Sequence, residues 1–489
     1  MNKLTTRIAL SVAAFGLAVL PGQAQPSLLA IGTLSQSRAG DNADLSGLTY
    51  KLENGAPANL LGGLGSGLAY ASGNTFLALP DRGPNAVTFD NAIDSTVSYI
   101  NRFHTVTMDL EPNTAGSGLP FTLTPTMRST TLLWSLTPLV YGTGAGLGVG
   151  SGVPPVNNFL LHFFTGRSDN FNPNQNSGDP NDARFDSESI RVSNDGLSVF
   201  ISDEYGPYVY QFSRFTGVRL RSYKLPDYFY VSNLKPVGAD EISGNTSGRT
   251  ANKGMEGLAL TPDGRTLVGI MQNALLQDAA LGGNAANLLR IVTVNVLTGQ
   301  THQYAYLLTN GSGVSDICAI NNHEFLVDER DGKGLEGGDG ATSNNAEVKQ
   351  IFKIDLAGAV DISNMDGAAA ANHAVKKTLF LDIVTALAGH VAADHIPSKI
   401  EGIAFGPDVK KGGTKLHTLW VSNDNDFLLS TSDVPSIANP NQFYVFGFTD
   451  ADLMGSTLVP QFGGSSSQNQ NSQGQDSHNQ GSQNQNSQN

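Results

Sequence analysis

Cysteine is almost absent from this sequence, because Cys318 is the only one among 489 residues. No intrachain disulfide can therefore form, and the stability of the fold must come from packing or from bound ions. Cys318 lies within the apolar segment DICAI, which indicates a small buried core residue.

Positive charge is also scarce. The chain has 29 lysine and arginine residues against 43 aspartate and glutamate residues, which gives a formal net charge of −14. This charge argues against nucleic acid or an anionic membrane surface as a partner. It fits a protein that binds cations.

The apolar run near the N-terminus is too short to cross a bilayer. It is the segment IALSVAAFGLAVL, which follows the basic residues Lys3 and Arg7 and precedes the small-residue sequence Gly22-Gln23-Ala24. This pattern predicts a cleaved signal peptide, residues 1–24, rather than a membrane anchor. We therefore expect a secreted or periplasmic protein.

The opposite end lacks apolar residues. Residues 463–489 consist mainly of Ser, Gln and Asn and cannot form a core, so we expect a disordered tail there. The whole chain is 39% hydrophobic, which is enough for a large core. We expect residues 25–462 to form a single domain and the protein to be a monomer.

Turn-forming residues, by contrast, are abundant. The 55 glycines and 22 prolines, with Asn and Ser between short apolar runs, indicate many turns and few long helices. The turns Asn194-Asp195-Gly196 and Pro262-Asp263-Gly264 each separate two short apolar runs and favour tight hairpins. The same pattern of strand, turn, strand and polar residue occurs in five segments: 67–83, 188–206, 256–273, 316–332 and 401–426.

Two further candidate strands follow most of these hairpins. Four antiparallel strands that recur every 60 to 85 residues or so are typical of propeller blades, so we predict an all-β protein with a β-propeller fold. The last unit lacks a fourth strand, which residues 28–34 could supply to close the ring. Residues 45–52 and 90–165 leave room for another blade, so the pattern favours six blades and leaves five and seven open.

The acidic residues recur at the ends of these strands. In an antiparallel hairpin, the start of the first strand lies beside the end of the second, so we expect Glu188 beside Asp203 and Asp316 beside Asp328. The first strands line the central channel of a propeller, so their polar ends would gather at one rim. Side chains alternate along a strand, so one of Asp203 and Glu204 is expected to join the rim and the other to order the following loop. The sequence leaves open which acid does which.

Several of these segments carry a family resemblance. GLAYASGNTFLALPDRGPN, ESIRVSNDGLSVFISDEYGPYVYQF, MEGLALTPDGRTL and IEGIAFGPD together resemble the bacterial phytase-like proteins described as having esterase-like activity of phytase. The resemblance covers roughly residues 45–450 and is most specific at the DEYGP segment with its upstream glutamate. It implies a phosphodiesterase- or phytase-type activity that depends on recurrent Glu and Asp residues. The chain departs from the repeated Glu-Gly pair at Gly67 and Asp316.

The rim acids are candidate metal ligands. Like charges at one rim repel one another and raise each other's pKa unless a cation lies among them. Hard oxygen ligands suit Ca²⁺ or Mg²⁺ better than zinc. The alternative is that each glutamate only accepts backbone hydrogen bonds where two blades meet. The predicted ligands open or close the paired strands: Glu188, Asp203, Glu256, Asp328, Glu401 and Asp424.

Two arginines occupy equivalent positions after second strands. Arg82 in PDRG and Arg330 in DERDG could each clamp a phosphate with two N–H groups, and the alternative is a salt bridge to an adjacent acid. With Glu188, Asp203 and Glu204 they make up the predicted catalytic set.

These features lead to one main hypothesis and two alternatives. The main hypothesis is a secreted, divalent-metal-dependent hydrolase of small-molecule phosphate esters, in which a rim carboxylate takes a proton from water. The first alternative is a calcium-dependent lactonase or aryl-esterase. The second is a non-enzymatic binding propeller whose rim acids only order loops.

Overall fold

The computed structural model describes residues 25–34, 43–84, 92–94, 96–142, 150–206, 208–309, 313–336 and 342–461. The predicted signal peptide, residues 1–24, and the predicted tail, residues 463–489, lie outside the described residues. In the described part, no helix is long and apolar enough to cross a membrane.

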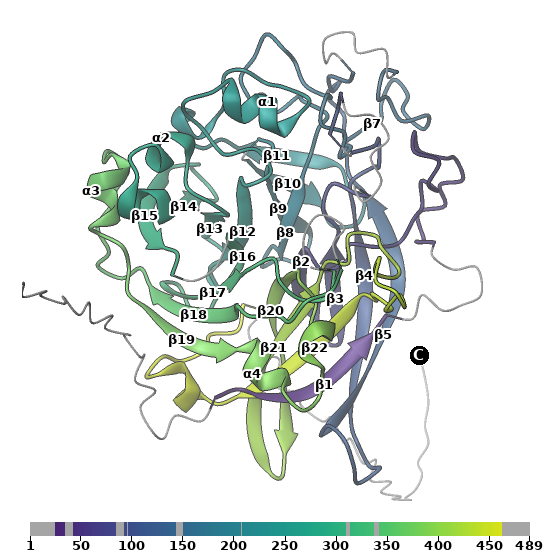
Figure 1. Cartoon of the computed structure of the whole chain (residues 1–489), viewed down its shortest axis with the longest axis vertical. Helices are drawn as coiled ribbons and strands as arrows, with labels where there is room; N and C mark the ends of the chain where they lie inside the picture. The colour runs from purple at the N-terminus through teal and green to yellow at the C-terminus, as the bar shows by residue number, and fades with distance from the viewer. Residues whose placement is uncertain are drawn as a thin grey trace, which may run out of the picture.

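Five antiparallel sheets of four strands each form a propeller in the described chain (Figure 1). The first blade contains β2 (Gly67–Ser72), β3 (Thr75–Leu79), β4 (Arg102–Pro112) and β5 (Phe121–Leu132). The second contains β8 (Ser187–Val192), β9 (Ser198–Asp203), β10 (Val209–Ser213) and β11 (Arg219–Tyr223). The third contains β12 (Met255–Leu260), β13 (Thr266–Met271), β14 (Leu288–Asn295) and β15 (Thr301–Leu307). The fourth contains β16 (Gly313–Ala319), β17 (Glu324–Arg330), β18 (Lys349–Asp355) and β19 (Lys377–Asp382).

The fifth blade is built from both ends of the chain. It contains β20 (Ile400–Lys411), β21 (Thr414–Asn423), β22 (Gln442–Phe448) and, as its outermost strand, the N-terminal β1 (Ser27–Thr33). β1 pairs antiparallel with β22, which confirms that the N-terminal strand closes the ring. The innermost strands contact one another in the cyclic order β2, β8, β12, β16, β20 and back to β2.

Within the described residues the sixth blade that the sequence favoured is not formed, and the five-blade alternative holds. Residues 90–165 instead supply β4 and β5, because β4 pairs with β3 and so belongs to the first blade. They also supply a small two-stranded sheet, β6 (Trp134–Ser135) and β7 (His162–Phe163).

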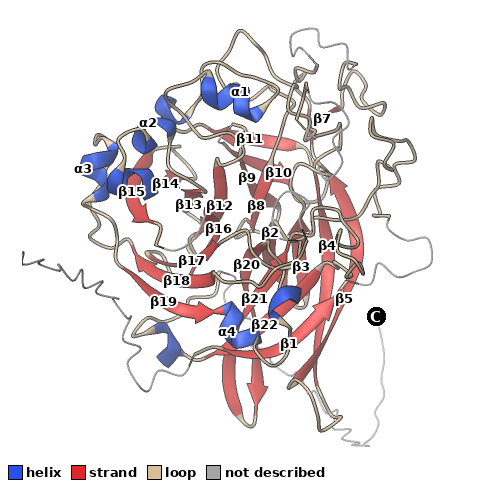
Figure 2. Ribbon diagram, viewed as in Figure 1, coloured by secondary structure: helices blue, strands red, loops and turns tan. Residues whose placement is uncertain are grey.

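Short helices lie outside the sheets, as Figure 2 shows in blue. They are α1 (Gly238–Ser243), α2 (Leu276–Ala279), α3 (Gly367–Ala371) and α4 (Ile383–Leu387), with 3-10 turns at Asp227–Phe229, Gly283–Asn287, Ala393–His395 and Asp450–Leu453. Apolar side chains fill the space between neighbouring blades, and Cys318 is a buried free thiol, as expected.

A buried ion pair closes the channel below the rim. The innermost strands approach so closely that a Cβ at Gly257 would lie 3.0 Å from the Cα of Asp316. Asp316 lies in this narrow part of the channel and accepts two hydrogen bonds, at 2.8 and 2.9 Å, from Arg191. Arg191 also donates to the carbonyls of Leu68 and Ile317 on two other blades. The channel therefore has a floor directly beneath the acidic rim.

Candidate functional site

β-bulges position the glutamates at the rim. The strand register shifts between Ser187 and Ile190, between Met255 and Gly257, and between Ile400 and Ile403. These shifts contain Glu188, Glu256 and Glu401 respectively, all of which are buried. Bulges re-aim side chains and are common beside active sites. The repeated glutamate is therefore a bulge residue in each of these three blades.

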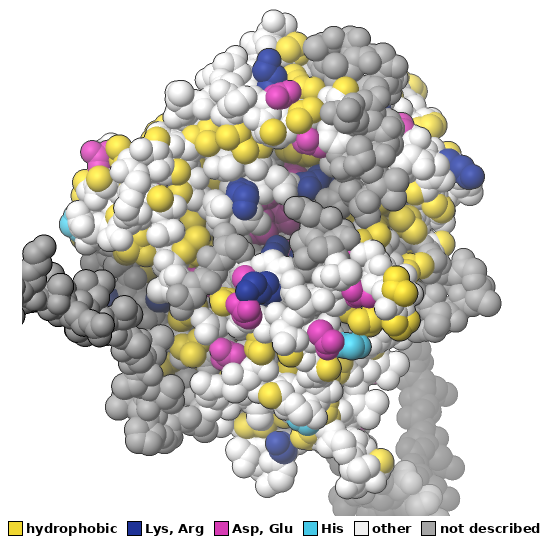
Figure 3. Space-filling view, in the orientation of Figure 1, with side chains coloured by type: hydrophobic (Ala, Val, Ile, Leu, Met, Phe, Trp, Pro, Cys, Tyr) yellow, Lys and Arg dark blue, Asp and Glu magenta, His cyan; other side chains and the backbone are white. Residues whose placement is uncertain are grey.

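Three carboxylates come together at the second blade. Asp186, Glu188 and Glu204 each offer an oxygen, and these oxygens lie within 4.8 Å of one another. We call these residues the acidic cluster. All three are buried, and one oxygen of Asp186, Oδ1, has no hydrogen-bond partner within the described residues. Figure 3 shows acidic side chains deep in the hollow at the centre of this face, with Lys and Arg side chains around it.

The acidic cluster is electrostatically strained. Burial raises the pKa of Glu188 well above its usual range, and the charges of Glu256 and Asp186 raise it further. Burial, followed by the charge of Asp186, also raises the pKa of Glu204. Crowded hard oxygens with a free ligand atom on Asp186 fit a divalent cation such as Ca²⁺ or Mg²⁺, which would favour the ionised carboxylates.

Asp203 and Glu204 divide their roles as the sequence anticipated, and the structure shows which does which. Asp203 accepts hydrogen bonds from the backbone N–H groups of Asp186 (3.1 Å), Tyr205 (2.9 Å) and Gly206 (3.2 Å). It therefore orders the loop and lies outside the acidic cluster, so its predicted role as a metal ligand stays a prediction. Glu204 lies in the acidic cluster and accepts a hydrogen bond from Gly254 N at 2.9 Å.

The two predicted arginines both pair with acids of the rim. Arg82 donates to Asp186 Oδ2 at 2.6 Å and to the Asn252 side chain. Arg330 is paired with Glu401 and donates to Ser315 Oγ at 2.8 Å. Both arginine side chains keep 14% exposure. Each arginine therefore forms a salt bridge to an acid, which was the alternative to phosphate binding. Both arginines still lie at the mouth of the channel.

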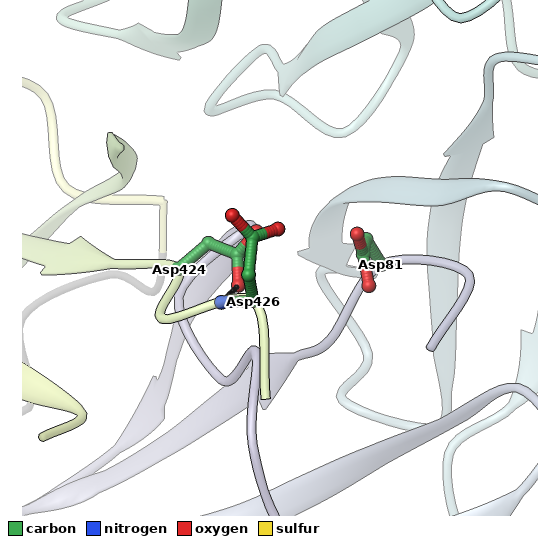
Figure 4. Close-up of side chains that lie close together, drawn as sticks. All are labelled: Asp81, Asp424 and Asp426. Carbon is green, nitrogen blue, oxygen red and sulfur yellow. Dashed lines mark hydrogen bonds between the residues drawn. The ribbon is translucent and has the colours of Figure 1, made fainter. Parts of the chain in front are cut away.

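A second acidic group faces the first blade. Asp81, Asp424 and Asp426 also offer carboxylate oxygens within 4.8 Å of one another, and Figure 4 shows Asp81 facing the other two. Lys399 Nζ lies 2.8 Å from Asp424 Oδ2 and also contacts Asp426. A lysine ammonium therefore supplies the positive charge that this second group needs. Burial raises the pKa of Asp424 to about 7.

Asp328 stands apart from both groups. It pairs in register with Asp316, as predicted, but it belongs to neither set of clustered oxygens. Both of its oxygens are buried without a hydrogen-bond partner in the described chain, and burial raises its pKa well above the usual range. The role of Asp328 as a metal ligand therefore stays a prediction.

The sequence reasoning missed several residues at the site. Asp186 lies two positions before Glu188 in FDSES, and this period-2 spacing was a usable signal. Asp81 is the polar residue that ends the repeat at 67–83, so the repeat was a usable signal for it, whereas Asp426 and Lys399 lie in irregular segments beside strands.

Comparison with known proteins identifies a family that matches most of the chain. A family model described as phytase-like, esterase-like activity of phytase, matches residues 59–427. An uncharacterized secreted protein of Arthroderma benhamiae is 32% identical over 180 residues, which covers 30% of this chain and 34% of that protein. The match thus spans about a third of that relative's length.

Two solved propellers are similar to this chain at low identity. A periplasmic gluconolactonase of Pseudomonas aeruginosa is 12% identical with a TM-score of 0.32 and covers 86% of this chain and 99% of its own. A putative 6-phosphogluconolactonase of Bacteroides uniformis is 13% identical with a TM-score of 0.30 and the same coverage. At these values the similarity carries no argument about function.

Proposed function

We propose, from the premise that this chain belongs to the phytase-like family, that it is an exported, divalent-metal-dependent hydrolase of small phosphate esters. The observation that carries the proposal is the acidic cluster, in which Asp186 offers a free oxygen on one side and binds Arg82 on the other. A cation-binding group and a guanidinium thus meet at one carboxylate.

Asp186, Glu188 and Glu204 would hold the cation. Their oxygens are the ligand type that Ca²⁺ and Mg²⁺ prefer, and no softer ligand lies among them. When bound, such a cation neutralises phosphate oxygens and lowers the pKa of water.

The chain's own residues would orient the ester and move the proton. Arg82 can donate to a phosphate oxygen while Asp186 fixes the position of the guanidinium. Glu256 is the candidate proton acceptor. Glu256 lies beside Glu204 at the rim, and burial, followed by the charge of Glu204, raises its pKa well above its usual range.

Export is supported by two observations. The N-terminal pattern of basic residues, apolar run and small residues is that of a signal peptide. The Arthroderma relative is described as a secreted protein.

The test is a substrate screen on the purified protein after chelation and re-addition of Ca²⁺, Mg²⁺ or Mn²⁺. We expect cation-dependent release of phenol from a bis-aryl or mono-aryl phosphate and none from lactones or aryl carboxylate esters. Lactone or aryl-ester hydrolysis would replace the proposal with the calcium-dependent lactonase alternative. Turnover of neither class would favour a binding propeller.

A further inference from the structure

Three arginines surround Tyr205 beside the acidic cluster. Arg249 Nε donates to the Tyr205 carbonyl at 2.8 Å, and the guanidinium of Arg184 lies 5.0 Å from the centre of the Tyr205 ring. The charge of Arg82 also acts on the Tyr205 phenol. We call Arg82, Arg184 and Arg249 the arginine cluster.

Loops from separate parts of the fold bring these arginines together. Arg82 follows β3 of the first blade, Arg184 precedes β8 of the second, and Arg249 precedes β12 of the third. Glu241 of α1 links two of them, at 3.4 Å from Arg184 Nη1 and 2.5 Å from Arg249 Nη2.

Each arginine of the cluster has a buried N–H group without a partner. Within the described residues, Arg82 Nε, Arg184 Nη2 and Arg249 Nη1 make no hydrogen bond. The side chains of Arg184 and Arg249 are only 2% and 0% exposed. A buried donor that lacks an acceptor is costly, and more so on a charged group. By contrast, the equally buried Arg290 is held by both oxygens of Asp278.

The three guanidinium groups share two ion-paired carboxylates, Asp186 and Glu241. Further acids lie near them: the charges of Asp81 and Glu204 also act on Arg82, and those of Asp182 and Asp203 also act on Arg184.

We propose that the arginine cluster is an oxyanion subsite that binds a phosphate group, either as free phosphate or as part of the substrate. Orphan donors from three guanidinium groups match the acceptor oxygens of phosphate, and arginine forks are suited to such oxygens. Arg82 connects the subsite to the acidic cluster through Asp186, so a phosphate held here would lie beside the candidate metal ligands. The substrate role rests on the proposed function, whereas binding of free phosphate does not.

The test measures binding of inorganic phosphate by calorimetry on the whole protein with a chelator present. Under these conditions a metal-held phosphate is lost, but an arginine-held phosphate remains. We expect saturable binding to the wild type, weakened about tenfold or more by Arg184→Gln or Arg249→Gln, because each removes a charge-assisted hydrogen bond. Arg214→Gln, at a half-buried turn position remote from the cluster in sequence, is the control and should bind as the wild type does.

A second variant covers the case in which a glutamine variant fails to fold. Arg249→Lys keeps the charge but loses the planar fork, so it should also weaken phosphate binding. Absence of saturable binding to the wild type, or equal affinity in Arg249→Lys, Arg184→Gln and Arg214→Gln, would overturn the proposal. Phosphate binding in chelator without any ester hydrolysis would leave the subsite standing and remove the proposed function.

A second experiment tests whether the phosphate group of the substrate occupies the subsite, and in it the activating cation replaces the chelator. If the substrate's phosphate occupies the subsite, Arg249→Lys should raise KM for an aryl phosphate and weaken inhibition by inorganic phosphate by similar factors. An unchanged KM with weakened phosphate inhibition would assign the subsite to free phosphate alone.

Discussion

Asp203 and Glu204 are adjacent in the chain, yet Asp203 accepts three backbone hydrogen bonds in its loop and Glu204 points its carboxylate into the acidic cluster. Asp203→Ala should lower the free energy of unfolding by ~3 kcal/mol, because buried N–H groups lose their acceptor. Glu204→Gln should leave the fold intact and weaken cation binding. Urea unfolding in chelator and calcium titration separate the two effects, and a calcium affinity unchanged by Glu204→Gln would remove Glu204 from the metal site.

The metal-free protein should lose stability as the pH rises. Burial raises the pKa of Asp203 to about 8, so the folded protein keeps a proton that the unfolded chain releases near pH 4. Its contribution to stability is complete below about pH 4 and declines up to about pH 8. In chelator, we expect the free energy of unfolding to be at least ~1 kcal/mol lower at pH 8 than at pH 5. Asp203→Asn should flatten this profile, whereas a stability that increases toward pH 8 would contradict it.

Lys399 should be the counter-ion of the second acidic group. Lys399→Met leaves Asp81, Asp424 and Asp426 crowded without a positive charge, so the free energy of unfolding should fall by ~2–3 kcal/mol. Added Ca²⁺ should recover part of the loss, because the cation can take the place of the ammonium. Thermal melts with and without Ca²⁺ measure both effects. The exposed Lys333→Met, whose partner Glu347 is also exposed, is the control and should change little.

Ring closure by β1 should contribute strongly to stability. Leu29 is fully buried in the fifth blade, so Leu29→Ala should lower the free energy of unfolding by ~3 kcal/mol. Ser27→Ala, at an exposed position of the same strand, should have almost no effect. Equal stability of the two variants in urea would show that the N-terminal strand does not hold the ring together.

The sequence predicted the parts of the fold that have local signals. The five hairpins were visible because turn residues such as Pro262-Asp263-Gly264 separate apolar runs, and the closing strand was visible because the last unit lacked one. The number of blades could not be predicted. Nothing local in the sequence shows that the long β4 pairs with β3, and β5 with β4, instead of β4 and β5 forming a sheet of their own.

The candidate site could be predicted only in part. Glu188, Glu256 and Glu401 repeat within regular hairpins, so their gathering at one rim followed from strand pairing. The division between Asp203 and Glu204 depends on how the chain leaves β9, which strand alternation does not determine. Arg184 and Arg249 come from irregular loops and meet only through the tertiary fold.

The central claim is that the acidic cluster binds the cation on which activity depends. The most direct measurement is calcium binding by calorimetry to chelator-treated wild type, Glu188→Gln and the exposed-acid control Glu347→Gln, with aryl phosphate turnover measured on the same samples. We predict that Glu188→Gln lowers both affinity and turnover by about tenfold or more, while the folded protein stays intact because a repulsive charge has been removed. Equal calcium affinity and equal turnover in all three proteins would contradict the account.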